Sequence, residues 1–332
     1  MCLLMGMAAG GMLPVAYALL AEIMPTRHRG WMLVLIGGVG AVGGYFAASY
    51  SSELLQPEFG WRIMWFLNLP TGLVLIALSP LLPESARFLQ QMGRGDEARR
   101  ALARFGAVVH QAPEIGAEDH SYVPPIDKAF IGLTGALTMA ALVWGLVNFG
   151  LLLWLPSLLV SEGRSVGDAS GLIAQSTIIA MPTVVLSAWL YCAWSTKWSL
   201  ITMMGVMTLG LAGFLLRGAD VGWLSSPIPS LVLVIVGSCG VISVLLPYTT
   251  ESYPLRIRGR ATGWIAGCSK LGGLVAQGLA VIGAVPVFGI AALIVAAPAL
   301  LAMALIAGLG HETRGRDLRD VDAGMLRADR AR

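Results

Sequence analysis

Charged side chains are scarce in this sequence. Asp, Glu, Lys and Arg together make up 12% of its 332 residues, whereas hydrophobic residues make up 56% and the mean hydropathy is +0.75. A water-soluble domain usually carries about a quarter charged residues. The shortage therefore excludes a soluble globular protein, and the formal net charge of +3 does not indicate a nucleic-acid partner.

The sequence also lacks the motifs of an enzyme or an ATP-driven pump. Its four cysteines fall in apolar segments without paired ligand spacing, so they are typical of packing residues. A Walker-type phosphate-binding loop is absent, and no cluster of His, Asp and Glu and no Ser–His arrangement lies within an apolar segment. We therefore expect no enzyme activity, no cofactor and no metal site.

Long apolar runs take the place of charge. In lipid, only a helix can satisfy its own backbone over such a run, so the sequence predicts an all-α membrane protein. Eighteen Lys and Arg residues fall in the loops on one side and three in those on the other, which places the basic loops and the C-terminus in the cytoplasm. The nine expected spans are 1–21, 31–52, 61–82, 131–160, 171–194, 200–217, 227–248, 262–284 and 287–308.

A nine-residue pattern occurs twice and relates two parts of the chain. The segment EIMPTRHRG at 22–30 recurs as ESYPLRIRG at 251–259, with the Glu, the Pro, both Arg and the final Gly in the same places. Three glycines of the following apolar run recur at the same offset of 229 residues. Each copy reads as a polar, basic turn between two apolar runs. We infer a parallel internal repeat of a helix–loop–helix unit.

The place of the repeat predicts helices that this sequence lacks. The long loop separates three spans from six, and the second copy joins the fourth and fifth of those six. Two equal halves would then require three more helices on the N-terminal side, giving twelve; the alternative is a complete nine-span protein. The expected domains are a partial N-terminal half at 1–82, an interdomain loop with a short amphipathic helix at 83–130, a six-helix C-terminal half at 131–310 and a cytoplasmic tail at 311–332.

Several motifs resemble the major facilitator superfamily. PESARFL at 83–89 is similar to the signature after the sixth helix of sugar porters, the repeated segments resemble the loops after the fourth and tenth helices, and HETRG at 311–315 resembles the signature after the twelfth. LPVAYALLAE at 13–22, VNFGLLLWLPSLLV at 147–160 and SKLGG at 269–273 resemble the branch of organic-ion and nicotinate-type transporters. The loop 195–199 departs from that branch, because it reads STKWS in place of a Gly-Arg-Arg type turn.

The resemblance implies a major facilitator fold, with nine of twelve transmembrane helices present, and a secondary transporter that works by alternating access. An organic acid suits this chain better than a sugar, because the Gln-Gln-x-Ser-Gly pattern of sugar porters is absent. The alternatives are a sugar transporter, a receptor that has lost transport and a non-functional fragment, and we expect no transport by residues 1–332 alone. The expected partners are a small-molecule substrate, the lipid bilayer and H+, with the protein a monomer in the cell (plasma or inner) membrane.

Charged residues near the span ends are candidates for a cytoplasmic gate, which the resemblance implies. Carboxylate and guanidinium groups on one side of the membrane can form charge-assisted bonds that hold two halves together in one state and break in the other. Alternatively, these charges serve only to orient the chain. The gate candidates are Glu22, Arg27, Arg29, Glu84, Arg87, Glu251, Arg256, Arg258, Glu312 and Arg314.

Lys270 is the most informative polar residue within a span. It lies about eight residues into the span 262–284, hence about 12 Å from its cytoplasmic end at 1.5 Å per residue. An ammonium at this depth is costly, so we expect it to face a watery cavity and attract an anionic substrate. The alternatives are snorkelling to the interface and a carboxylate partner in the missing helices. The substrate-pathway candidates are Tyr17, Asn68, Trp144, Asn148, Gln175, Ser243 and Lys270.

Acidic residues are absent from the middle of every expected span. A buried carboxylate is the usual proton carrier in a membrane protein. We therefore expect proton coupling to use residues in the missing helices, and the alternative is a carrier that is not coupled to protons.

Overall fold

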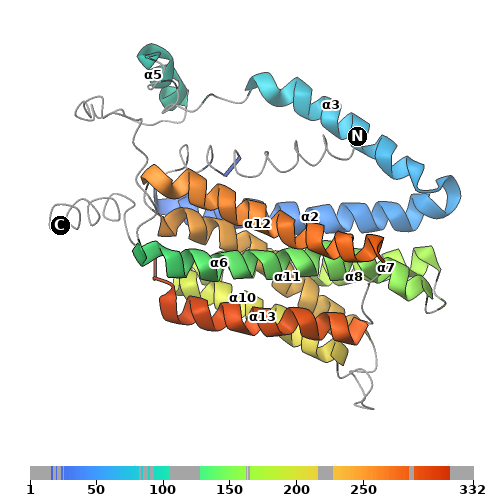
Figure 1. The fold of residues 1–332 in the computed structure, drawn as a ribbon. Helices are drawn as coiled ribbons and strands as arrows, with labels where there is room; N and C mark the ends of the chain where they lie inside the picture. The colour runs from blue at the N-terminus through green and yellow to red at the C-terminus, as the bar shows by residue number, and fades with distance from the viewer. Residues whose placement is uncertain are drawn as a thin grey trace.

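The computed structural model is helical throughout its described part (Figure 1), which confirms the all-α prediction. No strand occurs among the residues described. These residues are 16, 17, 20, 24, 26–81, 84, 89, 93–104, 128–161, 163, 165–215, 227–253, 255–283 and 288–314.

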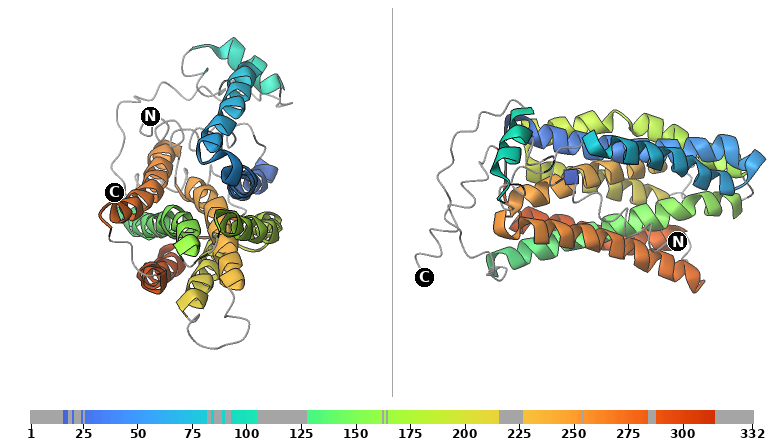
Figure 2. Two further views of the ribbon diagram at one scale, coloured as in Figure 1. Left: turned by 90° about the vertical axis from the view of Figure 1, so that its right-hand side faces the viewer. Right: turned by 90° about the horizontal axis from the view of Figure 1, so that it is seen from above.

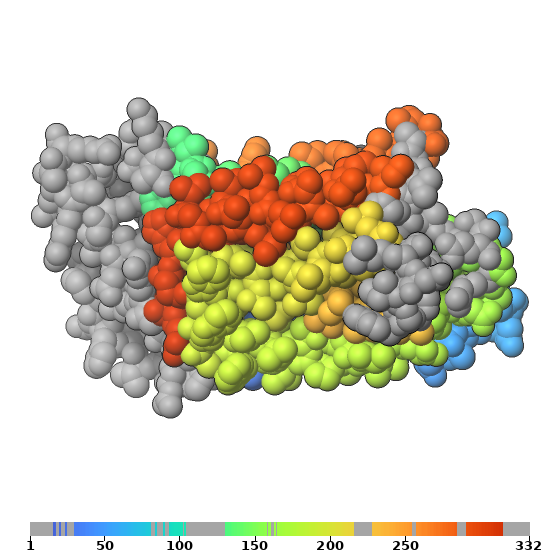
Figure 3. Space-filling model, turned by 90° about the horizontal axis from the view of Figure 1, so that it is seen from below, coloured from blue at the N-terminus to red at the C-terminus, as the bar shows by residue number. Residues whose placement is uncertain are grey.

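Most of the described helices lie side by side in one bundle, which Figure 2 shows end-on. Within the bundle α6 packs on α12 and α13, and α10 packs on α11 and α13. The helices α13 and α10 are adjacent on the face seen in Figure 3. The bundle consists of α2 (Thr26–Phe59), α6 (Lys128–Leu146), α7 (Leu152–Ser161), α8 (Val166–Ala180), α9 (Thr183–Trp189), α10 (Thr196–Leu215), α11 (Pro227–Ser252), α12 (Leu255–Val281) and α13 (Phe288–Leu309).

The helix α2 carries the contact between the two expected halves. It belongs to the N-terminal part of the chain, yet it packs against α8, α9 and α11 of the C-terminal part. Two other elements lie apart from the bundle (Figure 1). The helix α3 (Arg62–Leu78), which runs into the short 3-10 turn η1 (Ser79–Leu81), packs on α2 and has no buried residue, whereas α5 (Gly95–Arg104) lies in the expected interdomain loop.

Among the described residues, six helical segments are long and apolar enough to cross a membrane. They are Gly30–Phe59, Phe130–Ser157, Val166–Trp194, Thr196–Leu215, Ile228–Ser252 and Ile290–Leu309. The helix α3 is apolar but has 17 residues, whereas α12 has 27 residues but carries arginines in its first turns and a lysine further along. The expected span 1–21 lies largely outside the described residues.

The arginines of the repeated motif lie at the starts of helices, so the prediction of a turn at these positions is wrong. The helix α2 begins at Thr26 and α12 begins at Leu255, each directly after the proline of its motif copy. Because a proline has no N–H to donate to the preceding turn, it favours a break before a new helix. Cations in a first turn oppose the helix dipole. Helix stability therefore does not explain the basic residues of the motif.

Two π turns interrupt the helices of the C-terminal half. The turn η2 (Val147–Leu151) joins α6 to α7, and η3 (Leu190–Trp194) follows α9. A π turn is rare and often marks a functional site. The sequence predicted an uninterrupted helix over 131–160. This segment is apolar on nearly all sides, so the shift of one residue at a π turn leaves no visible change in its hydrophobic pattern.

Direct backbone contact holds α6 against α12. A Cβ atom at Gly145 would lie 2.0 Å from the Ser269 carbonyl oxygen, and one at Gly272 would lie 2.3 Å from the Leu142 carbonyl oxygen. Glycine at these two positions lets the helices approach closely. A Cβ atom at Gly263 would instead meet nothing within 4 Å. The glycines of the repeated helix therefore differ in their structural roles.

Candidate substrate pathway and C-terminal polar cluster

Phe149 of η2 is the centre of a group of three side chains, in which Trp144 is buried, Phe149 is half-buried and Lys270 is exposed. The Lys270 ammonium lies over its ring, with Nζ 4.4 Å from the ring centroid. The Trp144 ring meets it edge-on, with 5.6 Å between centroids. The Trp144 indole is oriented by its hydrogen bond to the Ser238 carbonyl oxygen, at 2.9 Å. Two predicted pathway residues are thus brought together by an aromatic residue that the sequence did not single out.

Asn148, a third predicted pathway residue, faces the other half of the protein. Tyr45 of α2 donates its hydroxyl to Asn148 Oδ1. On the opposite side, Gln277 of α12 donates its amide to the Phe149 carbonyl oxygen. Sequence reasoning missed Tyr45, which reads as an ordinary aromatic residue. It could have found Gln277, because that residue is a polar group within an apolar span.

Tyr17 and Ser243 lie beside two glycines of α2. Tyr17 is 4% exposed, and its hydroxyl has no hydrogen-bond partner among the described residues. A Cβ atom at Gly37 would lie 2.0 Å from that hydroxyl, and one at Gly38 would lie 3.0 Å from Ser243 Oγ. Ser243 donates to the Cys239 carbonyl oxygen at 2.6 Å. An unpaired buried hydroxyl is uncommon, which keeps Tyr17 a candidate for substrate contact.

The remaining two pathway candidates do not contact this group. Asn68 is exposed on α3 and donates its side-chain amide to the Met64 carbonyl oxygen of its own helix, at 2.9 Å. Gln175 is exposed on α8. Their part in a substrate pathway stays a prediction.

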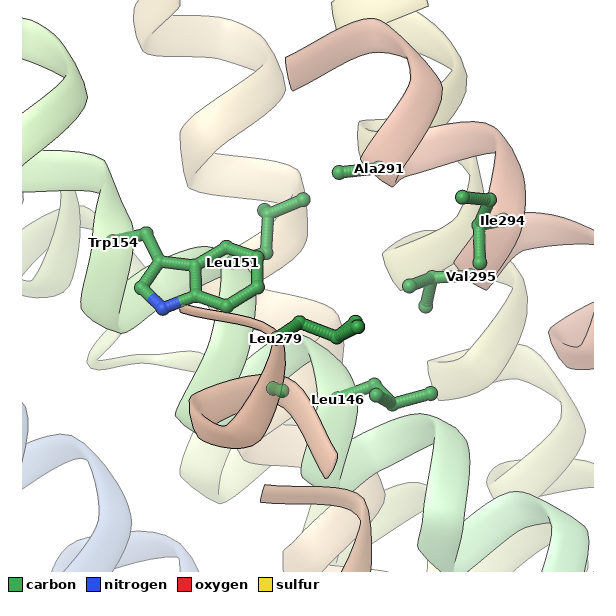
Figure 4. Close-up of a pocket in the computed structure, with 8 residues that line it drawn as sticks. Leu146, Leu151, Trp154, Leu279, Ala291, Ile294 and Val295 are labelled. Atoms are coloured by element: carbon green, nitrogen blue, oxygen red, sulfur yellow. The ribbon is translucent and has the colours of Figure 1, made fainter. Parts of the chain in front are cut away.

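A small apolar cavity of about 50 Å³ lies between η2, α7, α12 and α13 (Figure 4). Leu151, Leu279 and Val295 line it from three different elements, and the Trp154 indole forms another side. Its lining contains no charged group, so a carboxylate does not suit it. The cluster of Lys270, Asn148 and Gln277 around Phe149 is therefore the better candidate for a substrate site.

A second polar cluster forms where the chain after α13 meets the start of α10. Glu312 Oε1 accepts hydrogen bonds from the Thr196 amide at 3.0 Å, the Thr196 hydroxyl at 2.6 Å and the Arg314 amide at 3.1 Å, while Oε2 accepts one from the Ser195 hydroxyl. Partial burial would raise the pKa of this carboxyl, but the hydrogen bonds outweigh it and lower the pKa to about 2. Glu312 is thus an ionised carboxylate at a helix N-terminus, where the dipole favours an anion.

Hydroxyl groups join this carboxylate to the predicted gate residue Glu251. The Thr313 amide donates to the Thr196 hydroxyl oxygen at 3.1 Å, and the Thr313 hydroxyl donates to Glu251 Oε2 at 3.0 Å. The Tyr191 hydroxyl donates to the same oxygen at 2.6 Å. Gly30 of α2 lies against this pair, since a Cβ atom there would be 3.4 Å from the Tyr191 ring and 3.6 Å from Glu251 Oε1. The cluster therefore touches the N-terminal part of the chain.

The described arginines of the predicted gate donate to backbone carbonyls. Arg314 Nη1 donates to the Trp194 oxygen at 3.0 Å, and Arg258 Nε donates to the Tyr253 oxygen at 3.2 Å. Glu84 is exposed. The remaining gate candidates lie outside the described residues or have undescribed side chains, and they are Glu22, Arg87, Arg27, Arg29 and Arg256.

The long apolar helices of the bundle are those of an integral membrane protein. Between these helices, hydrogen bonds join α2 to η2 and η2 to α12. A sequence model of the family described as the Major Facilitator Superfamily matches residues 1–277. The chain belongs to the Major Facilitator Superfamily, a family of transporters, and it is not an enzyme. The resemblance inferred from the sequence motifs is thereby confirmed.

Two named relatives come from Acinetobacter baylyi. The chain is 27% identical to the niacin transporter NiaP over 351 residues, which cover 96% of this chain and 74% of that protein. It is 24% identical to a benzoate transport protein over 296 residues, which cover 82% of this chain and 59% of that protein. A double-tryptophan mutant of XylE superimposes with a TM-score of 0.72 at 19% identity, covering 91% of this chain and 68% of that one, which shows the fold alone.

Proposed function

We propose that this protein is a secondary transporter of a small aromatic carboxylate, which binds beside Lys270 and Phe149. The observation that carries the proposal is the Lys270 ammonium over the Phe149 ring, on an exposed side of the membrane helix α12. An ammonium at this depth calls for an anionic partner or water, and a flat ring beside it suits a substrate that has both a carboxylate and an aromatic ring. The relatives named for niacin and benzoate support this class, because both compounds are aromatic monocarboxylates.

We infer that transport uses alternating access, with α2 as the element that changes its contacts. On the cytoplasmic side Gly30 lies against Tyr191 and Glu251, and deeper in the bundle Tyr45 bonds to Asn148. Both sets of contacts are formed in this structure, and rocking of the halves would break the set at Gly30 when the cytoplasmic side opens. The hydroxyl-linked cluster around Glu251 would then act as part of the cytoplasmic gate. Proton coupling would use a carboxylate outside the expected spans of this sequence, since none has one at mid-depth.

Uptake of radiolabelled benzoate and nicotinate into membrane vesicles tests the proposal, using the protein as its own cells make it. We expect saturable uptake that Lys270→Ala weakens by raising KM at least about tenfold, because a charge-assisted hydrogen bond contributes about 1.5–3 kcal/mol. Lys128→Ala, at the first residue of α6, controls for the loss of a lysine. Neutral benzamide should be unaffected by either change. Uptake of neither acid by the unaltered protein would contradict the proposed substrate class.

A further inference from the structure

We propose that Gln277 is a positioning residue, which holds the π turn η2 so that the Phe149 ring stays beneath the Lys270 ammonium. The effect on substrate rests on the proposed function. The effect on Lys270 does not, and it can be measured without any substrate.

The backbone of η2 has the hydrogen bonding of a π turn. The Leu152 amide donates to the Val147 carbonyl oxygen five residues earlier, so the regular α-helical bonding is interrupted around Phe149. Gln277 supplies a donor from the neighbouring helix, through its side-chain amide, to the Phe149 carbonyl oxygen. The amide therefore stabilises the π turn from outside.

One face of α12 meets this turn. Lys270, Gly273 and Gln277 are spaced three and four residues apart, so they lie on one face of the helix. A Cβ atom at Gly273 would be 2.8 Å from both Cβ and Cδ2 of Phe149. The glycine thus lets Phe149 rest on α12 between the amide, which holds its carbonyl, and the ammonium, which meets its ring.

The π turn sets the direction of the Asn148 and Phe149 side chains. An α-helix advances about 100° per residue, so converting the π turn to a regular α turn would rotate the side chains beyond it by roughly that angle relative to those before it. Asn148 would then lose its direction toward Tyr45, and the Phe149 ring would leave Lys270. By holding the π turn, the Gln277 amide therefore maintains both the Tyr45–Asn148 contact and the Lys270–Phe149 contact.

The first test measures how fast an amine-reactive acylating reagent modifies Lys270 in lipid nanodiscs without substrate. Gln277→Met keeps the length of the side chain but removes the donor. We expect several-fold faster modification of Lys270 in this variant, because the ammonium loses the ring that stabilises its charged form. Leu274→Met, at an exposed position on the same helix, should leave the rate unchanged. Modification of Lys197 in the same digest provides an internal reference.

The second test measures binding of benzoate and of neutral benzamide to the same proteins. We expect Gln277→Met to weaken benzoate binding about tenfold and benzamide binding less than twofold. Adding Gln277→Met to Lys270→Met should cause no further loss of benzoate binding, because the amide acts through the lysine. Equal losses for both compounds, additive with the lysine change, would mean a general structural role and would overturn the proposal.

The two tests separate this inference from the proposed function. If the unaltered protein binds neither compound but Gln277→Met still accelerates modification of Lys270, the positioning role stands and the proposed substrate class fails. An unchanged rate at Lys270 overturns the positioning role whatever the binding results. Should Gln277→Met fail to fold, Gln277→Asn replaces it, because it keeps an amide on a side chain that is one methylene shorter. Faster modification of Lys270 in this variant supports the positioning role, and an unchanged rate overturns it.

Discussion

At the scale of a single residue, the Glu312 carboxylate makes the stability of the protein depend on pH in the acid range. Its pKa falls from the ordinary 4.5 to about 2 in the folded protein. A carboxyl with a lowered folded pKa contributes stability above its unfolded pKa, and that contribution disappears as the pH falls through the folded pKa. We expect Glu312→Gln to lower the unfolding temperature in detergent at neutral pH, and its difference from the unaltered protein to shrink between about pH 4.5 and pH 2.

The control for this comparison is Glu58→Gln, which changes an exposed carboxylate at the far end of α2. It should leave the unfolding temperature nearly unchanged at every pH. Identical pH curves for Glu312→Gln and the unaltered protein would show that the hydroxyl cluster does not stabilise this carboxylate.

At the scale of the element, the contact between α6 and α12 depends on glycine. A methyl group at Gly272 would lie 2.3 Å from the Leu142 carbonyl oxygen and 3.1 Å from the Leu146 amide nitrogen, so the two backbones would have to separate. We expect Gly272→Ala to destabilise the protein by about 1–3 kcal/mol, the usual cost of overpacking. Thermal unfolding in detergent measures this loss.

Gly263→Ala on the same helix is the matched control, because a Cβ atom there meets nothing within 4 Å. Alanine is the better helix former, so this change should be neutral or slightly stabilising. Equal stabilities of the two variants would refute close backbone contact between α6 and α12.

At the scale of the whole molecule, the distribution of basic residues predicts the orientation in the membrane. Eighteen Lys and Arg residues in the expected cytoplasmic loops and tail, against three in the opposite loops, predict a C-terminus in the cytoplasm. A green fluorescent protein fused after Arg332 should therefore fluoresce, while alkaline phosphatase fused at the same point should be inactive. The reverse pattern would exclude this orientation.

The internal repeat makes a further prediction at this scale. Equal halves require three helices in addition to the nine spans expected from the sequence, so we expect the protein in its own cells to exceed 35.0 kDa by about the mass of three helices. Intact mass spectrometry, or blotting against the C-terminal tail, measures the difference. A native mass of 35.0 kDa would support the nine-span alternative.

The part of the candidate site that the sequence predicted consists of groups that are rare in a membrane span. Trp144, Asn148 and Lys270 stood out because polar and amphipathic side chains are costly there, and the structure brings all three to η2. Phe149 could not be singled out, because its side chain is ordinary for an apolar span and only the π turn gives it a special place. The STKWS loop was seen as a departure from related transporters, but its hydroxyl donors to Glu312 were not foreseen.

The sequence by itself determined the helical class, the membrane location and the family, because apolar runs and motif spacings are local patterns. Only the tertiary structure decided which side chains meet. Tyr45 and Asn148 are 103 residues apart, and Phe149 and Gln277 are 128 residues apart. Such pairs are set by how the helices pack and by one π turn, and the local sequence of neither partner records that geometry.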